Sequence, residues 1–517
     1  MKIKNIFLAA VVGGVSLAAT LSFDVVAQDP ELSAYYLTGP DAAPGSPEYF
    51  ATLANLTELE QRIRERKSSF NKLVLSFVQP SLIDYQPNYL ACTGLFGYTC
   101  EEGKKHDDSI KEKSRLDFSV LREIIESLKK NGVETYIAVG GWNFSCIPHY
   151  YNVTAQGANA CGPENEVYDS FPNPKSPDRF DNPLSAEVAQ LAYQNIVKLA
   201  SDLNVAGIDI DYEEFWHADL NSYSWKLTPD QVSPPASNVE YIDTNSLTAL
   251  GKGGQVYNDN MSINPGAELL PRVMQDTENK FAAIIESISQ SIAVIKPELK
   301  LSLAAPATGG IPNMSANWGT NGHTAYTYGG AWWGGNLYGL IYNVALKKPD
   351  LINRFSSIGI MSYDLSERDC GGDTNLPCDL AGQVEFYYSS FLNWLKSGDS
   401  IRPGHAIVKG APTYAGASIQ PAKLLITPSI NVGFEVGKPA TGNLVLTKDM
   451  LDYISSQSVK HSSSGMIMWD LYKDKRYDEP LNGWNDDWAR PSDVLTSLCE
   501  KMGLSSDVYD CSSNILE

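Results

Sequence analysis

Short apolar runs alternate with longer amphipathic stretches along most of the chain. A short apolar run predicts a buried β-strand, and apolar residues spaced three or four positions apart predict a helix. We expect eight strands, which are SAYYLTG from Ser33, KLVLSFV from Lys72, TYIAVGG from Thr135, AGIDIDYE from Ala206, LSLAAPA from Leu301, IGIMSYD from Ile358, HAIVKGAP from His405 and GMIMWDLY from Gly465. Helices are expected between them at 118–130, 185–202, 277–296, 384–396 and 448–458.

Strands that alternate with helices predict an α/β fold with a parallel sheet. Eight such units in one long chain favour a closed (β/α)8 TIM barrel over an open doubly wound sheet. An open dinucleotide-binding sheet would carry a glycine fingerprint after its first strand, and YYLTGPDAAPG from Tyr35 lacks one. Long segments at 141–183, 214–272 and 308–337 follow strand ends. We expect these long βα loops to surround the active site, because barrel enzymes keep their sites at the carboxyl ends of the strands.

The start of the chain has the pattern of a secretory signal peptide. Lys2 and Lys4 precede an apolar run at 6–21, and small residues follow. We assign residues 1–27 to the signal. A membrane anchor is the alternative, but the run is barely long enough to span a bilayer. The mature chain is therefore expected to be secreted and extracellular, without membrane contact after signal cleavage.

The cysteines agree with export. An oxidising compartment favours disulfides, whereas zinc would need two-residue spacings and nearby histidines, and the six histidines are scattered. We expect the barrel to occupy 28–490, and 491–517 to form a C-terminal helix and a disulfide-closed tail packed on it. The eight cysteines form four close pairs, for which spacing suggests local disulfides: Cys92 with Cys100, Cys146 with Cys161, Cys370 with Cys378, and Cys499 with Cys511.

The charge and the aromatic content narrow the class of ligand. The formal net charge is −21 and the pI is near 4.7, so nucleic acid is an unsuitable partner. The chain has 27 Tyr, 16 Phe and 10 Trp residues, many of them near glycines and polar residues. Aromatic side chains in loops suit a ligand with flat apolar faces, and sugars are one such ligand.

The stretch NVAGIDIDYEEFW, which begins at Asn204, combines a buried strand with acids at every second position. Asp209, Asp211 and Glu213 share one face of the strand, about 6.5–7 Å apart per step. The apolar residues between them suit the outer face, which helices cover, so we expect the acids to point into the barrel. Carboxyl groups crowded in a dry interior cannot all ionise. The outermost would keep a raised pKa that suits a general acid.

A calcium site and a set of salt-bridged core acids are the alternatives to catalysis for this row. A linear row on one strand encircles a Ca²⁺ ion poorly, so no metal site is expected. Salt-bridged core acids would need an inward cation, and no strand run supplies an obvious Arg or Lys partner. The pattern therefore favours catalysis.

AGIDIDYE resembles the D-G-x-D-x-D-x-E signature of family 18 glycoside hydrolases, the chitinases and their relatives. Ala206 replaces the first acid of that signature, Ala138 replaces the serine of the strand-three motif S-x-G-G, and Glu214 follows the acid where many relatives have an aromatic residue and a proline. Four other stretches resemble the family's motifs on strands three, six, seven and eight, namely YIAVGGW from Tyr136, MSYD at 361–364, GAPTY at 410–414 and GMIMWD at 465–470.

The resemblance implies a retaining, substrate-assisted mechanism in which the substrate's own acetamido group is the nucleophile. Glu213 would protonate the glycosidic oxygen. Asp211 would orient the acetamido group and stabilise the positive ring, and Asp209 would share a proton with Asp211. Tyr363 would hydrogen-bond the acetamido oxygen.

The remaining site residues are implied to bind sugar. Asp364 would hydrogen-bond a sugar group near the scissile bond, and Trp469 would form the apolar floor under the distorted sugar. Tyr414 and Trp142 are further candidates for the cleft wall. No metal and no organic cofactor is called for.

The implied function is that of a monomeric chitinase that cleaves β-1,4 bonds between N-acetylglucosamine units of chitin or chitooligosaccharides. Only about fifty residues separate Tyr414 from Gly465, which is short for the α+β domain that larger relatives insert between strands seven and eight. Without that wall the cleft would be shallow, which favours endo cleavage. Two alternatives stay open: an endo-β-N-acetylglucosaminidase acting on the chitobiose core of N-glycans, and an inactive chitin-binding lectin.

Overall fold

The structure is a computed structural model, and all structural statements below concern the residues that it describes. These are 30–39, 51–99, 108–141, 144, 147–148, 160–161, 171–175, 184–213, 275–306, 341, 344, 348–365, 367, 377–392, 427–439, 443–460, 465–476 and 484–517. The predicted signal peptide, Trp142 and Tyr414 lie outside them.

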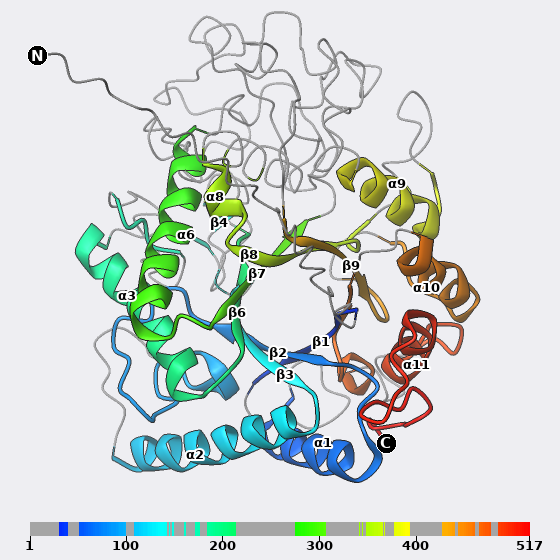
Figure 1. Cartoon of the computed structure of the whole chain (residues 1–517), viewed down its shortest axis with the longest axis horizontal. Helices are drawn as coiled ribbons and strands as arrows, with labels where there is room; N and C mark the ends of the chain where they lie inside the picture. Colours follow the sequence, from blue (N-terminus) through cyan, green and yellow to red (C-terminus); the bar gives the residue numbers. More distant parts are fainter. Residues whose placement is uncertain are drawn as a thin grey trace, which may run out of the picture.

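Eight parallel strands form a closed barrel, which confirms the predicted (β/α)8 fold (Figure 1). The first strand pairs with the second and also with the last, which closes the ring. The strands are β1 (Leu32–Leu37), β2 (Lys72–Val78), β3 (Glu134–Gly140), β6 (Gly207–Asp211), β7 (Lys300–Pro306), β8 (Phe355–Met361), β9 (Ser429–Glu435) and β10 (Met466–Trp469). A separate two-stranded sheet pairs β4 (Ile147–Pro148) with β5 (Ala160–Cys161).

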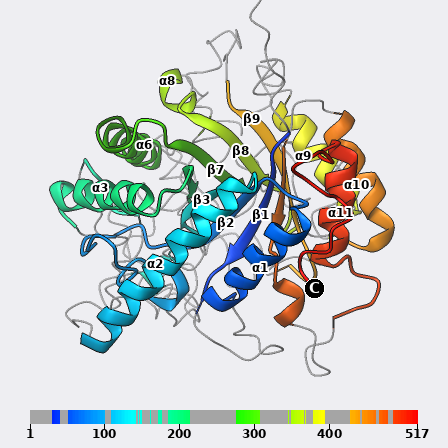
Figure 2. The same cartoon turned by 60° about the horizontal axis from the view of Figure 1, so that its bottom comes forward.

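Helices surround the barrel, as Figures 1 and 2 show. The five predicted helices are present, although α2 begins ahead of its predicted start and α9 lies a few residues earlier than expected. The α-helices are α1 (Leu53–Arg66), α2 (Asp108–Lys130), α3 (Ala186–Asp202), α6 (Gln275–Ile295), α8 (Pro349–Ile352), α9 (Leu380–Leu392), α10 (Leu451–Lys460) and α11 (Pro491–Met502). Short 3₁₀ turns lie at η1 (Leu95–Gly97), η10 (Lys448–Met450) and η11 (Lys473–Arg476).

Local sequence sets several helix ends. Thr52 and Asn55 form a reciprocal capping box at the start of α1, in which Asn55 N donates to Thr52 Oγ1 at 3.2 Å and Thr52 N donates to Asn55 Oδ1 at 3.0 Å. Ser185 caps α3 by accepting from Val188 N. Gly503 ends α11 in the left-handed conformation that glycine adopts without strain.

The seventh barrel strand is β9, so the prediction that HAIVKGAP from His405 fills this place is wrong. β9 pairs with β8 on one side and with β10 on the other. The run at 405–412, with the GAPTY motif and Tyr414, lies outside the described residues. Both runs contain apolar residues in a strand-like pattern, and only the pairing on both sides decides which one joins the ring. Residues 436–465 separate β9 from β10 and include η10 and α10, so no large domain is inserted there.

Apolar side chains pack on both faces of the strands. Ile208 and Ile210 point outward into the main core beneath the helices, and the Tyr212 ring lies 5.4 Å from that of Phe281 on α6. A smaller cluster fills the barrel interior and includes Tyr35, Val74, Phe77, Tyr136, Ala138 and Ile467. The acids of β6 therefore share the interior with aromatic and aliphatic side chains.

The C-terminal tail packs against the amino-terminal end of the barrel. The predicted disulfide between Cys499 and Cys511 is present. Arg66 on α1 donates to the carbonyl of Asn514 at 3.0 Å, and Tyr509 donates to the carbonyl of Gly132 at 2.7 Å. Cys92 and Cys378 are also disulfide-bonded. In the described part of the chain, no helix combines the length and the apolar character needed to cross a membrane.

Candidate active site

Strand β6 carries the acids into the barrel. Asp209 and Asp211 are 2% and 4% exposed, and Glu213, two residues beyond the strand's last buried acid, is partly exposed. The register places Asp209 between Ala138 of β3 and Ser302 of β7. The acids thus rise toward the carboxyl ends of the strands, where barrel enzymes hold their sites.

Two glycines make this placement possible. A Cβ on Gly207 would lie 2.2 Å from the ring of Tyr136, so only glycine leaves room for that ring inside the barrel. Gly140 has φ +100°, and a Cβ there would lie 2.3 Å from the carbonyl oxygen of Asp211. Both glycines therefore let β3 and β6 approach closely at the level of the acids.

Asp209 is held by donors on both oxygens. Tyr35 Oη donates to Oδ2 at 2.7 Å, and the Ser302 hydroxyl donates to Oδ1. Burial raises the pKa of Asp209, while the charge of Lys72 and these two hydrogen bonds oppose that rise. Each oxygen of Asp209 therefore already accepts a hydrogen bond from a side chain of another barrel strand.

Lys72 is an inward cation that sequence reasoning missed, so the expectation that no strand run supplies one is wrong. It begins β2 and is 4% exposed. Its Nζ lies 3.3 Å from Ser302 Oγ, 3.3 Å from Glu31 Oε1 and 3.9 Å from the centre of the Tyr136 ring. The run KLVLSFV gives no hint of this, because a lysine at a strand start usually reaches solvent, and here the closed ring turns its side chain inward.

Asp211 and Glu213 form a hydrogen-bonded acid pair. Burial, followed by the charges of Glu213 and Asp209, raises the pKa of Asp211 well above its ordinary value. Burial and the charge of Asp364 raise the pKa of Glu213 to about 8, against the lowering effect of its hydrogen bond with Asp211. The side-chain hydrogen bond of Asp211 is thus made with Glu213, and the proton shared between Asp209 and Asp211 stays a prediction. Asp211 Oδ1 is buried and accepts no hydrogen bond.

Tyr363 and Asp364 follow β8 and lie close to the acid pair. Burial, and then the charges of Asp211, Glu435 and Asp364, raise the pKa of the Tyr363 hydroxyl well above its ordinary value. Asp364 has φ +57°, an unusual backbone conformation that asparagine and aspartate tolerate better than other side chains. The residues predicted from the MSYD motif therefore do meet the β6 acids.

Trp469 ends β10 and offers an apolar surface beside these polar groups. Its ring centre lies 5.6 Å from that of Tyr35 and 5.6 Å from that of Phe77, with which it stacks at an interplanar angle of 30°. Trp469 is partly exposed. The Phe77 ring therefore covers one face of the indole. The proposed wall residues Trp142 and Tyr414 lie outside the described residues.

Glu435 at the end of β9 was missed because the seventh strand was misplaced. Its Oε1 forms an ion pair with Lys473 Nζ, and both side chains are nearly buried. Burial and the charges of Asp364 and Asp470 raise the pKa of Glu435 to about 8, and Lys473 opposes them. The signal in the sequence was the alternation in SINVGFE, which ends on an acid at the position where barrel sites lie.

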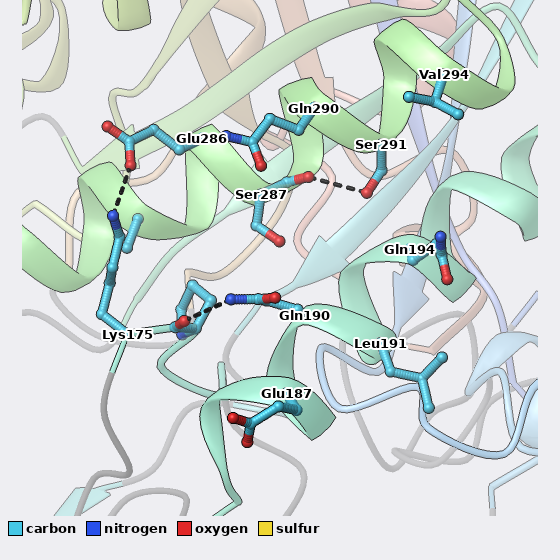
Figure 3. A pocket seen from close by; sticks show the side chains of 12 residues that line it. Lys175, Glu187, Gln190, Leu191, Gln194, Glu286, Ser287, Gln290, Ser291 and Val294 are labelled. Atoms are coloured by element: carbon cyan, nitrogen blue, oxygen red, sulfur yellow. Dashed lines mark hydrogen bonds and ion pairs between the residues drawn. The ribbon is translucent and has the colours of Figure 1, made fainter.

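No cluster of three or more metal-ligating side chains occurs among the residues that the structure describes. A groove of 510 Å³ lies outside the barrel between α3 and α6 (Figure 3). Its polar side chains are partly paired, with Lys175 Nζ 3.2 Å from Glu286 Oε2 and Gln190 donating to the Pro174 carbonyl at 3.0 Å. The perturbed acids are at the barrel end instead, which is therefore the candidate active site.

No protein-family model and no curated protein matches the chain. Solved structures similar to it are chitinases. Active domain 2 of the thermostable chitinase from Pyrococcus furiosus, a catalytic-site mutant complexed with chito-oligosaccharides, is 12% identical over 92% of this chain and 97% of that chain, with a TM-score of 0.39. The family GH18 chitinase from Chromobacterium violaceum is 12% identical over 92% and 83% of the two chains, with a TM-score of 0.38. The group IV chitinase from Ostrinia furnacalis is 9% identical over 92% and 100%, with a TM-score of 0.38. These values are too low to assign a family or an activity, so the function has to come from the site residues.

Proposed function

We propose that this protein is a secreted, retaining glycoside hydrolase that cleaves the β-1,4 bond following an N-acetylglucosamine unit, in chitin or chitooligosaccharides. The observation that carries the proposal is the acid pair: Glu213, with a pKa near 8, is hydrogen-bonded to Asp211, whose second oxygen is buried and free. A protonated acid beside a free acceptor suits substrate-assisted cleavage.

In the first step Glu213 donates its proton to the glycosidic oxygen. The bond from that oxygen to the anomeric carbon breaks, and the acetamido carbonyl oxygen bonds to the same carbon, which forms an oxazolinium ion. Asp211 Oδ1 accepts the hydrogen bond of the acetamido N–H, which orients the acetamido group and stabilises the positive charge that develops on it. The Tyr363 hydroxyl donates a hydrogen bond to the acetamido oxygen and so holds this oxygen in line with the bond that breaks.

In the second step water attacks the anomeric carbon from the side that the leaving sugar has left. Glu213 takes the proton of this water, and the bond to the acetamido oxygen breaks. Two displacements at one carbon retain its configuration. Trp469 lies under the distorted sugar, and Asp364 contacts a polar group near the scissile bond.

The substrate must carry a 2-acetamido group on the sugar whose anomeric bond is cut, because no protein nucleophile takes part. Cellulose-like chains lack this group and are not cut. Endo action is supported by the absence of a large domain between β9 and β10, since a deep tunnel wall would favour processive release of disaccharides. Disaccharide as the main product from a long chain in the first minutes would contradict it.

Mass spectrometry of products tests the proposal, with a chitin hexasaccharide and a high-mannose glycoprotein as substrates. Short N-acetylglucosamine oligomers from the wild type, and none from Glu213→Gln, would support it. Released glycans alone would move the activity to deglycosylation by the same chemistry. Retained chitin binding without any product would make the protein a lectin and overturn the proposal.

A further inference from the structure

Glu435 lies between two residues of the proposed sugar site. It ends β9 in register with Trp469 of β10, and the Val436 amide donates to the Trp469 carbonyl at 2.9 Å. On the other side β9 pairs with β8, where the Ser362 amide donates to the Gly433 carbonyl at 3.1 Å, immediately before Tyr363. The backbone therefore places Glu435 at the carboxyl end of the barrel, between the two strands that carry Tyr363 and Trp469.

Lys473 fixes one oxygen of Glu435. The side chains of the two residues are 5% and 6% exposed, and Lys473 Nζ pairs with Glu435 Oε1. The turn that carries Lys473 is itself anchored, since the Leu471 amide donates to the Tyr35 carbonyl at 3.0 Å and the Tyr472 amide donates to Asp470 Oδ1 at 3.0 Å. Glu435 is therefore held in one orientation and does not simply reach toward solvent.

The second oxygen of Glu435 is left without a donor. Among buried carboxylate oxygens in the described part of the chain, two accept no hydrogen bond, which are Asp211 Oδ1 and Glu435 Oε2. Leaving such an oxygen unpaired away from water is unfavourable unless a ligand supplies the donor. Both oxygens belong to residues at the ligand-facing end of the barrel, and the mechanism already gives Asp211 Oδ1 a partner.

The electrostatic environment agrees with a shared pocket. The charge of Glu435 helps raise the pKa of Tyr363, and the charge of Asp364 helps raise that of Glu435. A buried ion pair that served stability alone would more often have donors on both carboxylate oxygens. Lys473 also offsets the charge of Glu435, so this acceptor adds little net negative charge beside the catalytic acids.

We propose that Glu435, fixed by Lys473, is a substrate-positioning residue whose Oε2 accepts a hydrogen bond from a hydroxyl group of the sugar that lies against Trp469. This inference rests on the proposed function, because it concerns the same sugar. Glu435 would set the rotation of that sugar about the axis through the indole, and so align its acetamido group with Asp211 and Tyr363.

The experiment compares Glu435→Gln with the wild type on a chitin hexasaccharide and on hexasaccharides in which single hydroxyls are replaced by hydrogen. Glutamine keeps the volume of the side chain, and its carbonyl oxygen can still accept a hydrogen bond from Lys473. In that orientation the amide N–H group points toward the sugar, where the wild type has an acceptor. We expect kcat/KM to fall about 10- to 100-fold. Glu134→Gln breaks another Lys–Glu pair at the opposite end of the barrel, at 2.8 Å from Lys300, and is the control.

The hydroxyl-deleted substrates distinguish binding from a structural role. One deletion should lower kcat/KM of the wild type and of Glu134→Gln about tenfold or more, and should lower that of Glu435→Gln little further. Two results would overturn the inference while leaving the proposed function intact. One is a kcat/KM of Glu435→Gln equal to that of the wild type, and the other is an equal loss of kcat/KM on the hydroxyl-deleted substrates in all three proteins. If Glu435→Gln does not fold, the wild type alone still tests the inference. The inference is overturned if none of the single hydroxyl deletions lowers the kcat/KM of the wild type. A wild type that cleaves no N-acetylglucosaminide would overturn both.

Discussion

The carboxyl groups of Asp211 and Glu213 are hydrogen-bonded to each other inside the barrel, and this contact raises the pKa of Asp211 while lowering that of Glu213. Two acids of the same strand, both with raised pKa values, therefore lie side by side. Two displacements at one sugar carbon need an acid that can give a proton and take one back. A protonated Glu213 beside the buried Oδ1 of Asp211 supports that cycle.

Removing the acid should abolish turnover without abolishing binding. We expect Glu213→Gln to lower kcat on a chitin hexasaccharide about 10²- to 10⁴-fold, because general acid–base catalysis contributes that range. Binding of the hexasaccharide, measured by calorimetry, should stay within a few-fold of the wild type. A variant that keeps more than a tenth of the wild-type kcat would show that another group supplies the proton.

The activity should fall at alkaline pH. Glu213 has a pKa near 8 in the folded chain, so it is protonated and competent as an acid below that pH and loses its proton above it. Asp364→Asn removes a charge that raises this pKa, and asparagine tolerates the φ of +57° at this position. The alkaline limb of the kcat/KM profile should therefore move to lower pH by roughly 0.5–1 unit.

Asp510→Asn is the control for that profile, because Asp510 lies on the tail at the other end of the barrel. The alkaline limb of the kcat/KM profile of Asp510→Asn should coincide with that of the wild type. An alkaline limb that stays in place or moves to higher pH in Asp364→Asn would mean that Asp364 does not act on Glu213.

The buried ammonium of Lys72 should matter for stability more than a surface cation does. Lys72→Met leaves Glu31 and Asp209 without its charge, and we expect the free energy of unfolding to fall by about 2–3 kcal/mol. Lys300→Met breaks a half-exposed pair with Glu134 at the same end of the barrel and should lower it by at most about 1 kcal/mol. Denaturant unfolding of both variants checks this.

The effect of Lys72→Met should also depend on pH. Without Lys72 the pKa of Asp209 in the folded chain rises further above its unfolded value, so the folded state binds more protons across that interval. Stability then falls more steeply as pH rises, and the difference from the wild type should widen as pH rises through the range in which this carboxyl titrates. A difference that shrinks over this range would contradict the assigned contact.

The tail disulfide should stabilise the fold without affecting catalysis. The double variant Cys499→Ser/Cys511→Ser is expected to lower the free energy of unfolding by about 2–4 kcal/mol. Its kcat should equal that of the wild type, because the tail packs at the amino-terminal end of the barrel through Tyr509 and Gly132. Glu500→Gln on α11 serves as the control for a substitution in this region. A large loss of kcat at a temperature where the variant is folded would contradict this placement.

Much of the site followed from local sequence. The alternation of Asp209, Asp211 and Glu213 with apolar residues fixed which side chains face inward, since a strand turns successive residues to opposite faces. Tyr363, Asp364 and Trp469 come directly after or at the end of strands that were predicted, and the structure brings them to the same end of the barrel as Glu213.

The misplaced seventh strand shows where local patterns fail. HAIVKGAP contains the unbroken apolar run AIV, whereas SINVGFE in β9 alternates polar and apolar positions, and a choice based on local apolar runs favours the former. Pairing with both β8 and β10 gives the place to β9, and that pairing joins segments far apart in the chain. Glu435 was not predicted as a site residue because it ends the strand that was misplaced.

The sequence by itself determined the repeating strand–helix order, the inward row of acids and the short-range pairing of Cys499 with Cys511, because each depends on residues close together in the chain. Only the tertiary structure decided that Lys72 and Tyr35 act on Asp209, that Asp211 is hydrogen-bonded to Glu213, and that Glu435 is held by Lys473. Closing the ring brings Tyr35 within 2.7 Å of Asp209 across 174 residues. No local pattern encodes such contacts, because they depend on which strands become neighbours and on how the shared interior is filled.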